Sequence, residues 1–429
     1  MTLSNIKEVV SDRLGERYFE IEHDSGLKMI VYPKENYASS YVIFGTRYGS
    51  IDTAFRLNDD REFTYVPEGI AHFLEHKLFE SEEIDAFDRY SKTGANANAY
   101  TSFDRTCYLF SCTGKLKENL EILLDFVTHP YFTEQTVQKE QGIIGQEIKM
   151  TQDDPNWALL FSVLQAMYKY HPVQIEIAGT VESISHITAD LLYKCYNTFY
   201  NLENMVFCAV GNVDVDTVLE VADRILVRKD KVSIERKFFE EPDGVNKPYV
   251  ENEMAVTAPL FALGFKENIR TPERTTRELI LSQCIIELLS GKTSKLYNEL
   301  LNDGLINSNF SSEYLFGYGY SSLIFSGESE KYDEVAKRIR DEIDRLSREG
   351  IAAEDFERVR RMQYGRLIMS FNDIDDIANG VVASYFAGES IFEDAEVLSS
   401  ITLDEINDRL RSSVHTDCCS LSVIKPKGE

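Results

Sequence analysis

Hydrophobic and polar residues near the start of the chain alternate with the period of a β-strand and later recur with helical spacing. Alternating runs at 18–23 and 27–32 flank an Asp-Ser-Gly turn and predict a β-hairpin, and the apolar run 41–45 predicts a further strand. Apolar positions in 67–80 and 133–151 instead follow a helical period, which predicts helices. The first half of the chain therefore mixes strands and helices.

The same order of elements returns weakly in the second half. Segments with strand or helix periodicity follow one another at 261–265, 279–289, 310–326, 333–348 and 354–369. The charged, turn-rich stretch 227–247 separates the halves and predicts a linker. We therefore predict an α+β fold with two structurally similar α+β domains, at 1–226 and 248–429. Each is expected to be a mainly antiparallel sheet packed with helices.

Composition narrows the class of protein. The 429 residues are 43% hydrophobic and 11% aromatic, which indicates compact domains with more than one core. The formal charge of −27 opposes nucleic acid and anionic membranes, so we expect neither as a partner. Seven cysteines show no spacing typical of a disulfide framework or a metal knuckle. No apolar run reaches about 18 residues and the start lacks a signal-peptide pattern, so we expect a cytoplasmic protein.

The strongest chemical signal is the segment P-E-G-I-A-H-F-L-E-H-K-L-F-E at Pro67 to Glu80. Within it His72, Glu75 and His76 stand at i, i+3 and i+4, which places them on one face of a helix. Two imidazoles one turn apart can direct a nitrogen each at one divalent cation, and the carboxylate can hold a water on that cation. This H-x-x-E-H spacing predicts a metallopeptidase site, although two such histidines can also be surface residues of an acidic helix.

A third metal ligand is missing from that segment. The predicted helix 133–151 carries Glu140 and Glu147, seven residues apart and therefore two turns along one face. A carboxylate from this helix, together with a water, could complete a tetrahedral site. The alternative is that both glutamates are solvated helix charges.

Both segments resemble one known family. G-I-A-H-F-L-E-H-K-L-F-E resembles the inverted zinc motif of the insulinase, pitrilysin and mitochondrial processing peptidase family, and E-Q-G-I-I-G-Q-E-I-K-M resembles its third-ligand segment. The resemblance implies that His72, His76 and Glu147 bind Zn²⁺. It also implies that Glu75 is the general base and that Glu140 is a second glutamate that supports catalysis. The chain length resembles that of a half-size, two-domain bacterial subunit.

The segment after the motif resembles the strand on which members of that family bind an extended peptide. It begins at Gly94 and reads G-A-N-A-N-A-Y-T-S-F-D-R-T-C-Y. The resemblance implies a substrate-binding edge strand, with contacts expected from Ala97, Asn98, Ala99, Tyr100 and Thr101. The alternative is that this segment is already paired on both sides inside a sheet.

From these residues we predict a zinc-dependent endopeptidase that hydrolyses peptides or small unfolded segments. The alternative is a non-catalytic scaffold subunit of the same fold. The complete H-x-x-E-H motif together with Glu147 argues against a scaffold, which has no physical need for these side chains. Two histidines and a carboxylate also suit other first-row metals, so the identity of the metal stays open.

The second predicted domain cannot hold a copy of this site. No histidine occurs within 187–414, and aligning the two halves places Arg360 and Leu367 opposite the glutamates of helix 133–151. The second domain is therefore expected to cover or complete the first.

The resemblance also implies a pair of electrophilic donors in the metal-free half, an arginine followed seven residues later by a tyrosine. If a one-residue deletion is allowed, the matching stretch here places Leu301 and Asn307 at those positions, and neither can supply the same stabilisation. We therefore predict a heterodimer with a half-size paralogue that supplies the missing donors. The alternatives are a homodimer, or substitution by Tyr314 or Tyr318 of the same chain.

A phosphate loop is a competing interpretation of S-G-K-T-S at Ser290 to Ser294. The leading glycine of such a loop would fall at Ile286, and the preceding run has a helical pattern. Nucleotide binding is therefore not expected.

Overall fold

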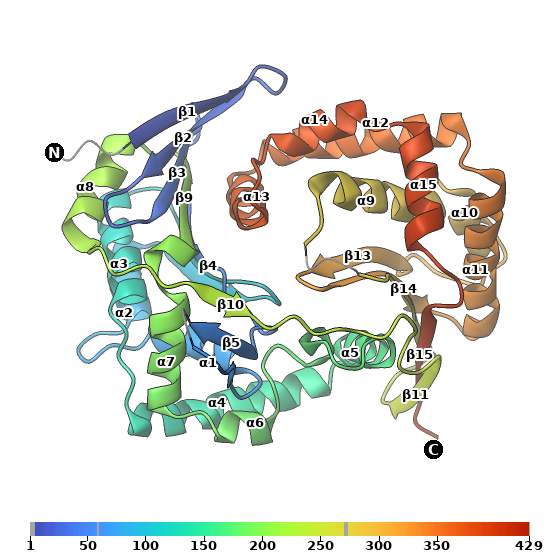
Figure 1. Ribbon diagram of the computed structural model, residues 1–429, viewed down its shortest axis with the longest axis horizontal. Helices are drawn as coiled ribbons and strands as arrows, with labels where there is room; N and C mark the ends of the chain where they lie inside the picture. Colours follow the sequence, from blue (N-terminus) through green and yellow to red (C-terminus); the bar gives the residue numbers. More distant parts are fainter. Residues whose placement is uncertain (1–4, 58–59, 270–272, 429) are drawn as a thin grey trace. The chain divides into compact units, whose positions relative to one another are not determined.

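The computed structural model describes residues 5–57, 60–269 and 273–428, which form two compact units. The first unit comprises Met1–Ile148, Glu176–Lys237 and Ile368–Glu393, and the second comprises Lys149–Ile175, Phe238–Leu367 and Asp394–Glu429. Each unit packs helices on a mainly antiparallel sheet (Figure 1). The predicted α+β class with two similar domains is therefore confirmed.

The first unit is built on a seven-stranded sheet with the order β1-β2-β3-β9-β4-β8-β7. Its strands are β1 (Asn5–Ser11), β2 (Glu16–Glu22), β3 (Lys28–Pro33), β4 (Ser40–Thr46), β7 (Asn96–Thr101), β8 (Thr106–Cys112) and β9 (Met205–Gly211). All neighbours are antiparallel except β3 and β9. A smaller sheet joins β5 (Ala54–Leu57) to β6 (Thr64–Tyr65) and β10 (Ile234–Arg236). The predicted hairpin is confirmed as β2 and β3, whereas β1 was not predicted.

Helices cover one face of this sheet and enclose the core of the unit. They are α1 (Ile70–Leu78), α2 (Ala86–Thr93), α3 (Leu116–Thr128), α4 (Glu134–Gln152), α6 (Val181–Ser185), α7 (Ala189–Phe199) and α8 (Val215–Ile225), with a 3₁₀ turn at Leu202–Asn204. Because side chains alternate along a strand, Val42 and Phe44 of β4 enter this core, and Phe73 and Leu74 of α1 belong to the same cluster. The core therefore fixes α1 to the sheet.

The second unit contains a five-stranded sheet with the order β11-β15-β12-β14-β13. Its strands are β11 (Tyr249–Met254), β12 (Leu260–Lys266), β13 (Ser311–Gly317), β14 (Tyr320–Glu328) and β15 (Cys419–Pro426). Its helices are α5 (Pro155–Met167), α9 (Thr276–Ser290), α10 (Lys295–Asn302), α11 (Tyr332–Glu349), α12 (Ala353–Ser370), α14 (Glu393–Ser400) and α15 (Leu403–Ser413), with a 3₁₀ turn at Pro172–Gln174. The strand pair predicted at 310–326 is confirmed as β13 and β14.

Each unit contains one helix whose residues come from the other half of the chain. Helix α13 (Ile374–Ala387) packs on β4 and β9 of the first sheet, on the face opposite α1 (Figure 1). Gly45 permits this approach, since a Cβ there would lie 3.2 Å from a methyl group of Val382. In return, α5 packs on β12 and β15 of the second sheet.

This exchange was not part of the predicted division into 1–226 and 248–429. Hydrophobic periodicity reports which face of a helix is buried and does not report which sheet buries it. Part of the predicted linker 227–247 is also ordered, because it forms β10 and pairs with β5. The predicted boundaries follow the order of the chain and stay a prediction about its domains.

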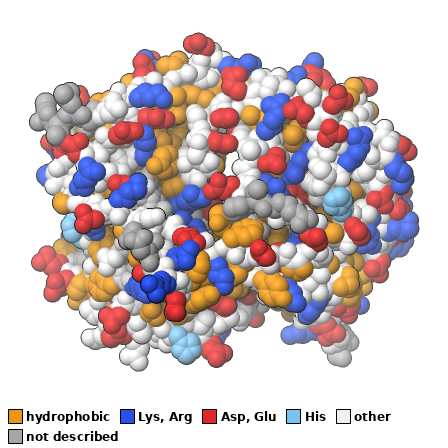
Figure 2. Space-filling view, viewed as in Figure 1, with side chains coloured by type: hydrophobic (Ala, Val, Ile, Leu, Met, Phe, Trp, Pro, Cys, Tyr) orange, Lys and Arg blue, Asp and Glu red, His pale blue; other side chains and the backbone are white. Residues whose placement is uncertain are grey.

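Two further features are the apolar character of the helices and the distribution of charged side chains on the surface. Among the described residues, no helix combines the length and the apolar character that a membrane span requires. On the face drawn in Figure 2, acidic and basic side chains are interspersed.

A buried histidine makes the stability of the second unit depend on pH. Nδ1 of His171 accepts from the backbone N–H of Val173, so Nε2 carries the proton and donates to the carbonyl of Tyr318 at 2.9 Å. Burial is the main cause that lowers the pKa of His171 to about 4, and Lys266 adds to it while the Tyr318 carbonyl and Glu241 oppose it. The folded unit therefore holds this ring neutral.

We expect acid to destabilise the second unit through His171. The unfolded chain binds the proton near pH 6.5 and the folded chain only near pH 4, so this contribution is complete above pH 6.5 and is lost as the pH falls. Between pH 7 and 5 the loss is about 2 kcal/mol. Urea unfolding followed by the fluorescence of Trp157, the one tryptophan, on α5 of the same unit, should show this slope. His171→Gln should flatten it, and an unchanged slope in the variant would contradict the assignment.

Candidate active site

Helix α1 presents the H-x-x-E-H residues from a fixed position. It begins after Gly69, whose φ of +84° is left-handed, and a Cβ at this residue would collide with the carbonyl of Ala178. Ile70, Phe73, Leu74 and Leu78 are buried on the sheet side. The rings of His72 and His76 project one turn apart, with their centroids separated by 4.6 Å.

Three side chains from two helices converge at this point. Nε2 of His72 lies 3.5 Å from Oε1 of Glu147, and Nε2 of His76 lies 3.5 Å from Oε2 of the same carboxylate. Hydrogen bonding to His72 is the main cause that lowers the pKa of Glu147. Across the described residues, these three form the one group of His, Cys, Asp or Glu able to hold a metal ion, with ligand atoms within 4.8 Å of one another.

Glu140 supports this cluster from behind His76. Its buried carboxylate accepts from Nδ1 of His76 at 3.0 Å, since an ionised carboxylate has no proton to donate. Nδ1 therefore carries the proton, and Nε2 keeps a lone pair on the side of Glu147. Burial opposes a positive charge on His76, but Glu140, Glu75 and Glu147 outweigh it and raise the pKa of this ring. The same negative charges would favour a divalent cation at Nε2.

The remaining motif carboxylate, Glu75, is 8% exposed and is held by a strand. Oγ1 of Thr101, the last residue of β7, donates to Oε2 of Glu75 at 2.6 Å. Burial raises the pKa of Glu75, although His72, the Thr101 hydrogen bond and His76 oppose the shift. A carboxylate with a raised pKa is better suited to accept a proton near neutral pH than an exposed one.

The residues present fit a divalent zinc-like cation. Two imidazole nitrogens and one carboxylate oxygen are a common ligand set of catalytic zinc, which keeps a fourth position for water. The Glu140 contact provides the support that a metal-bound imidazole usually receives at its other nitrogen. Nδ1 of His72 is buried and has no hydrogen-bond partner in the described part of the chain. The orientation of that ring is therefore set by packing and by the contact of Nε2 with Glu147.

The segment with the predicted peptide contacts forms strand β7. β7 pairs with β8 on one side and is the last strand of the sheet among the described residues. Ala97, Ala99 and Thr101 face α1, whereas Asn98 and Tyr100 lie on the opposite face. The backbone N–H of Ala99 donates to the side-chain oxygen of Asn98 at 2.9 Å. One side of β7 is therefore open to an added strand.

The positions compared with the electrophilic donor pair lie in the second unit. Leu301 is exposed on α10, and the side chain of Asn307 donates to Glu328. The hydroxyl of Tyr314 lies 2.8 Å from Ser321 Oγ and accepts from Arg409. Tyr314 is thus held by neighbours within its own unit.

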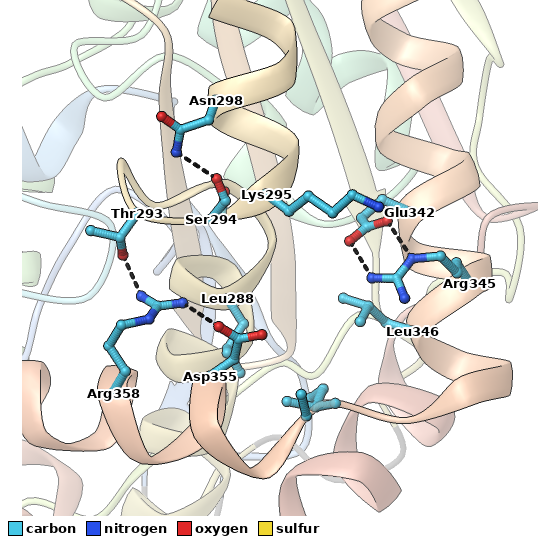
Figure 3. Close-up of a pocket in the computed structure, with 12 residues that line it drawn as sticks. Leu288, Thr293, Ser294, Lys295, Asn298, Glu342, Arg345, Leu346, Asp355 and Arg358 are labelled. Atoms are coloured by element: carbon cyan, nitrogen blue, oxygen red, sulfur yellow. Dashed lines mark hydrogen bonds and ion pairs between the residues drawn. The ribbon is translucent and has the colours of Figure 1, made fainter.

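Thr293 and Ser294, the last two residues of the S-G-K-T-S segment, line a cavity of about 270 Å³ in the second unit (Figure 3). Arg358 donates to Thr293 and to Asp355, and Arg345 pairs with Glu342. Acidic partners thus already neutralise the two arginines, and a phosphate would have to displace them. The expectation that this segment is no phosphate loop stays a prediction.

Two contacts of the site have no signal in the sequence. The hydrogen bond from Thr101 to Glu75 joins residues that are 26 positions apart on different elements, and the one from Tyr100 to Asn379 spans 279 positions. Strand periodicity does place Thr101 on the face of Ala97 and Ala99, but it does not identify the partner.

Two family models match successive parts of the chain. Residues 64–181 match the family model described as insulinase (peptidase family M16), and residues 186–363 match the model described as the peptidase M16 inactive domain. The chain is 40% identical over 429 residues to the uncharacterized zinc protease YmfH of Bacillus subtilis, with 98% of this chain and 100% of that protein covered.

Solved structures resemble the whole chain as well. A crystal structure of an M16-like peptidase from Alicyclobacillus acidocaldarius is 33% identical, with a TM-score of 0.91 and coverage of 100% of this chain and 99% of the other. A protease from Helicobacter pylori shares the fold with a TM-score of 0.82 at 20% identity, over 99% of this chain and 100% of the other.

Proposed function

Because this chain belongs to the insulinase (M16) family of peptidases, we propose that it is a zinc-dependent endopeptidase acting on peptides or small unfolded segments. The observation that supports this proposal most directly is the position of the two histidines. Nε2 of His72 and Nε2 of His76 each lie 3.5 Å from one of the two oxygens of Glu147. The zinc protease name of the Bacillus subtilis relative supports zinc as the metal. His72, His76 and Glu147 would hold the ion.

The reaction is assigned to side chains of the first unit. A zinc ion at this site would polarise a water and the peptide carbonyl, lowering the pKa of the water toward about 7. Glu75 accepts the proton of the attacking water and passes it to the leaving amine. Glu140 keeps the proton of His76 on Nδ1 and so fixes the tautomer of that ring.

We assign the peptide to the open side of β7. Main-chain pairing with an edge strand accepts varied sequences, which suits a peptidase of broad specificity. The N–H of Ala99 is a donor for such pairing once the side chain of Asn98 releases it. Ala97, Asn98, Ala99, Tyr100 and Thr101 remain the proposed contact residues.

The catalytic assembly is proposed to contain two chains. Leu301 and Asn307 stand where related peptidases would place the donors that stabilise the carbonyl under attack, and neither side chain can replace them. The hydroxyl of Tyr314 is already bonded to Ser321 and Arg409, which argues against its use as a substitute. A half-size paralogue that keeps the arginine and the tyrosine could supply them. A homodimer is the alternative.

Turnover of a peptide mixture, followed by mass spectrometry, tests the function and the assembly together. We expect slow cleavage by the zinc-loaded chain alone and a rise of about 10²-fold with the paralogue, because one such donor typically contributes that much. A chelator should abolish cleavage, and zinc should restore it. A rate that the paralogue leaves unchanged would contradict the heterodimer. No cleavage in either sample would favour the scaffold alternative.

A further inference from the structure

The side chain that ends β7 points at the proposed general base. Thr101 Oγ1 lies 2.6 Å from Glu75 Oε2 and 3.3 Å from Thr106 Oγ1. The hydroxyl of Thr106 donates its single proton to the carbonyl of Tyr48 at 2.9 Å, so it can only accept from Thr101. The shorter contact and the negative charge both direct the Thr101 proton to Glu75.

We propose that Thr101 is a positioning residue for Glu75. Its hydrogen bond occupies Oε2 of the carboxylate and leaves Oε1 as the oxygen that accepts the proton of the attacking water. Glu75 has two side-chain torsions beyond Cβ that the helix does not fix, so a second anchor is needed to hold one carboxylate orientation. This inference rests on the proposed function of the site.

The anchor is rigid because β7 is held on both faces and along one edge. Thr101 pairs with Thr106 of β8, and a tight turn follows in which Ser102 N–H donates to Arg105 O at 2.8 Å. On the opposite face, the hydroxyl of Tyr100 donates to Oδ1 of Asn379 on α13 at 2.9 Å. The β-branched side chain of Thr101 also has restricted χ1 freedom. The hydroxyl is thus fixed by the sheet.

One strand would then serve two purposes. Its open edge receives the peptide backbone, while the side chain at its end orients the base that acts on that peptide. Loss of the Thr101 hydroxyl leaves the backbone of β7 in place, so peptide binding should persist. The orientation of the base should suffer, and the defect should appear in kcat and hardly in KM.

The test compares Thr101→Val, which removes the hydroxyl at nearly constant shape, with Thr101→Ser, which retains it. With zinc content verified, we expect kcat to fall about 10- to 100-fold in Thr101→Val, and KM to change less than about threefold. Thr101→Ser should stay within about threefold of wild type. In the Glu75→Gln background, Thr101→Val should cause no further loss, because the hydroxyl acts through Glu75.

Thr198→Val is the matched control. Thr198 is a buried threonine on α7 whose hydroxyl donates to the carbonyl of Lys194 at 2.8 Å, remote from Glu75 in its contacts. It should lose stability and keep kcat. An unchanged kcat in Thr101→Val, or a Thr101→Ser variant as slow as Thr101→Val, would overturn the proposal.

Crystal structures of the two Thr101 variants separate this inference from the proposed function. We expect the Glu75 carboxylate to leave its position in Thr101→Val and to keep it in Thr101→Ser. An identical carboxylate position in both variants would overturn the inference whatever the activity. Failure of zinc-loaded wild type to cleave any peptide, with or without the paralogue, would refute the proposed function while the crystal structures still decide the role of Thr101.

Discussion

Replacing Glu75 with glutamine is expected to lower kcat by about 10²- to 10⁴-fold, the usual contribution of one general base. The amide has the size of the carboxylate and its oxygen can still accept from Thr101, so the local structure should survive. It cannot take the proton of the attacking water. Zinc should remain at about one ion per chain, because His72, His76 and Glu147 are untouched. Steady-state cleavage of one quenched peptide, with elemental analysis of the same samples, measures both quantities.

Glu134→Gln provides the matched control for that variant. Glu134 lies at the start of α4, where its carboxylate accepts from the backbone N–H of Ala189 and makes no contact with the histidines. The same chemical change there should leave kcat within about twofold, as expected of a substitution outside the catalytic contacts. Cleavage by Glu75→Gln at the wild-type rate, with full zinc content, would remove Glu75 from the mechanism.

Replacing His76 with alanine should remove the metal itself. The change deletes one of three converging ligands and leaves Glu140 without its imidazole partner. We expect zinc to fall from about one ion per chain to a small fraction of that, and kcat to fall by at least about 10³-fold, since neither water nor carbonyl is then activated. Elemental analysis after dialysis measures the zinc.

Thermal unfolding gives a second measure of this loss that does not depend on turnover. A ligand that binds only the folded state stabilises it, so added zinc should raise the melting temperature of wild type and not that of His76→Ala. His129→Ala is the control, because His129 is largely exposed and its partners among the described residues, Asp125 and Thr128, are near it in sequence. Equal zinc content in wild type and His76→Ala would place the metal elsewhere.

The parts of the site that could be predicted from the sequence are those that helical spacing determines. His72, Glu75 and His76 lie on one turn of α1, and Glu140 and Glu147 lie two turns apart on α4. Local periodicity fixes each set internally. Family resemblance was needed to bring the two helices together, since spacing within one helix contains no information about its neighbour.

The contacts that could not be predicted join elements remote in sequence. Nothing in the strand pattern of β7 indicates that Thr101 meets Glu75, or that Tyr100 meets Asn379. Strand β1 was also missed, because most of its residues are exposed and polar ones interrupt the alternation. Packing decides these features, and packing depends on the whole fold.

Because α13 belongs to the first unit, that unit lacks one of its helices until late in the synthesis of the chain. Synthesis runs from the N-terminus, yet α13, which covers β4 and β9 and carries the partner of Tyr100, is made after most of the chain. Domains generally fold as their residues emerge, but the first unit lacks this covering helix until residues 374–387 have been made. Before that point the nascent chain would already carry the three proposed metal ligands on α1 and α4, while the opposite face of the sheet lacks its covering helix. A chain that ends before α13 would therefore lack the cover of β4 and β9 and the partner of Tyr100, and under the proposed function it is expected to be inactive.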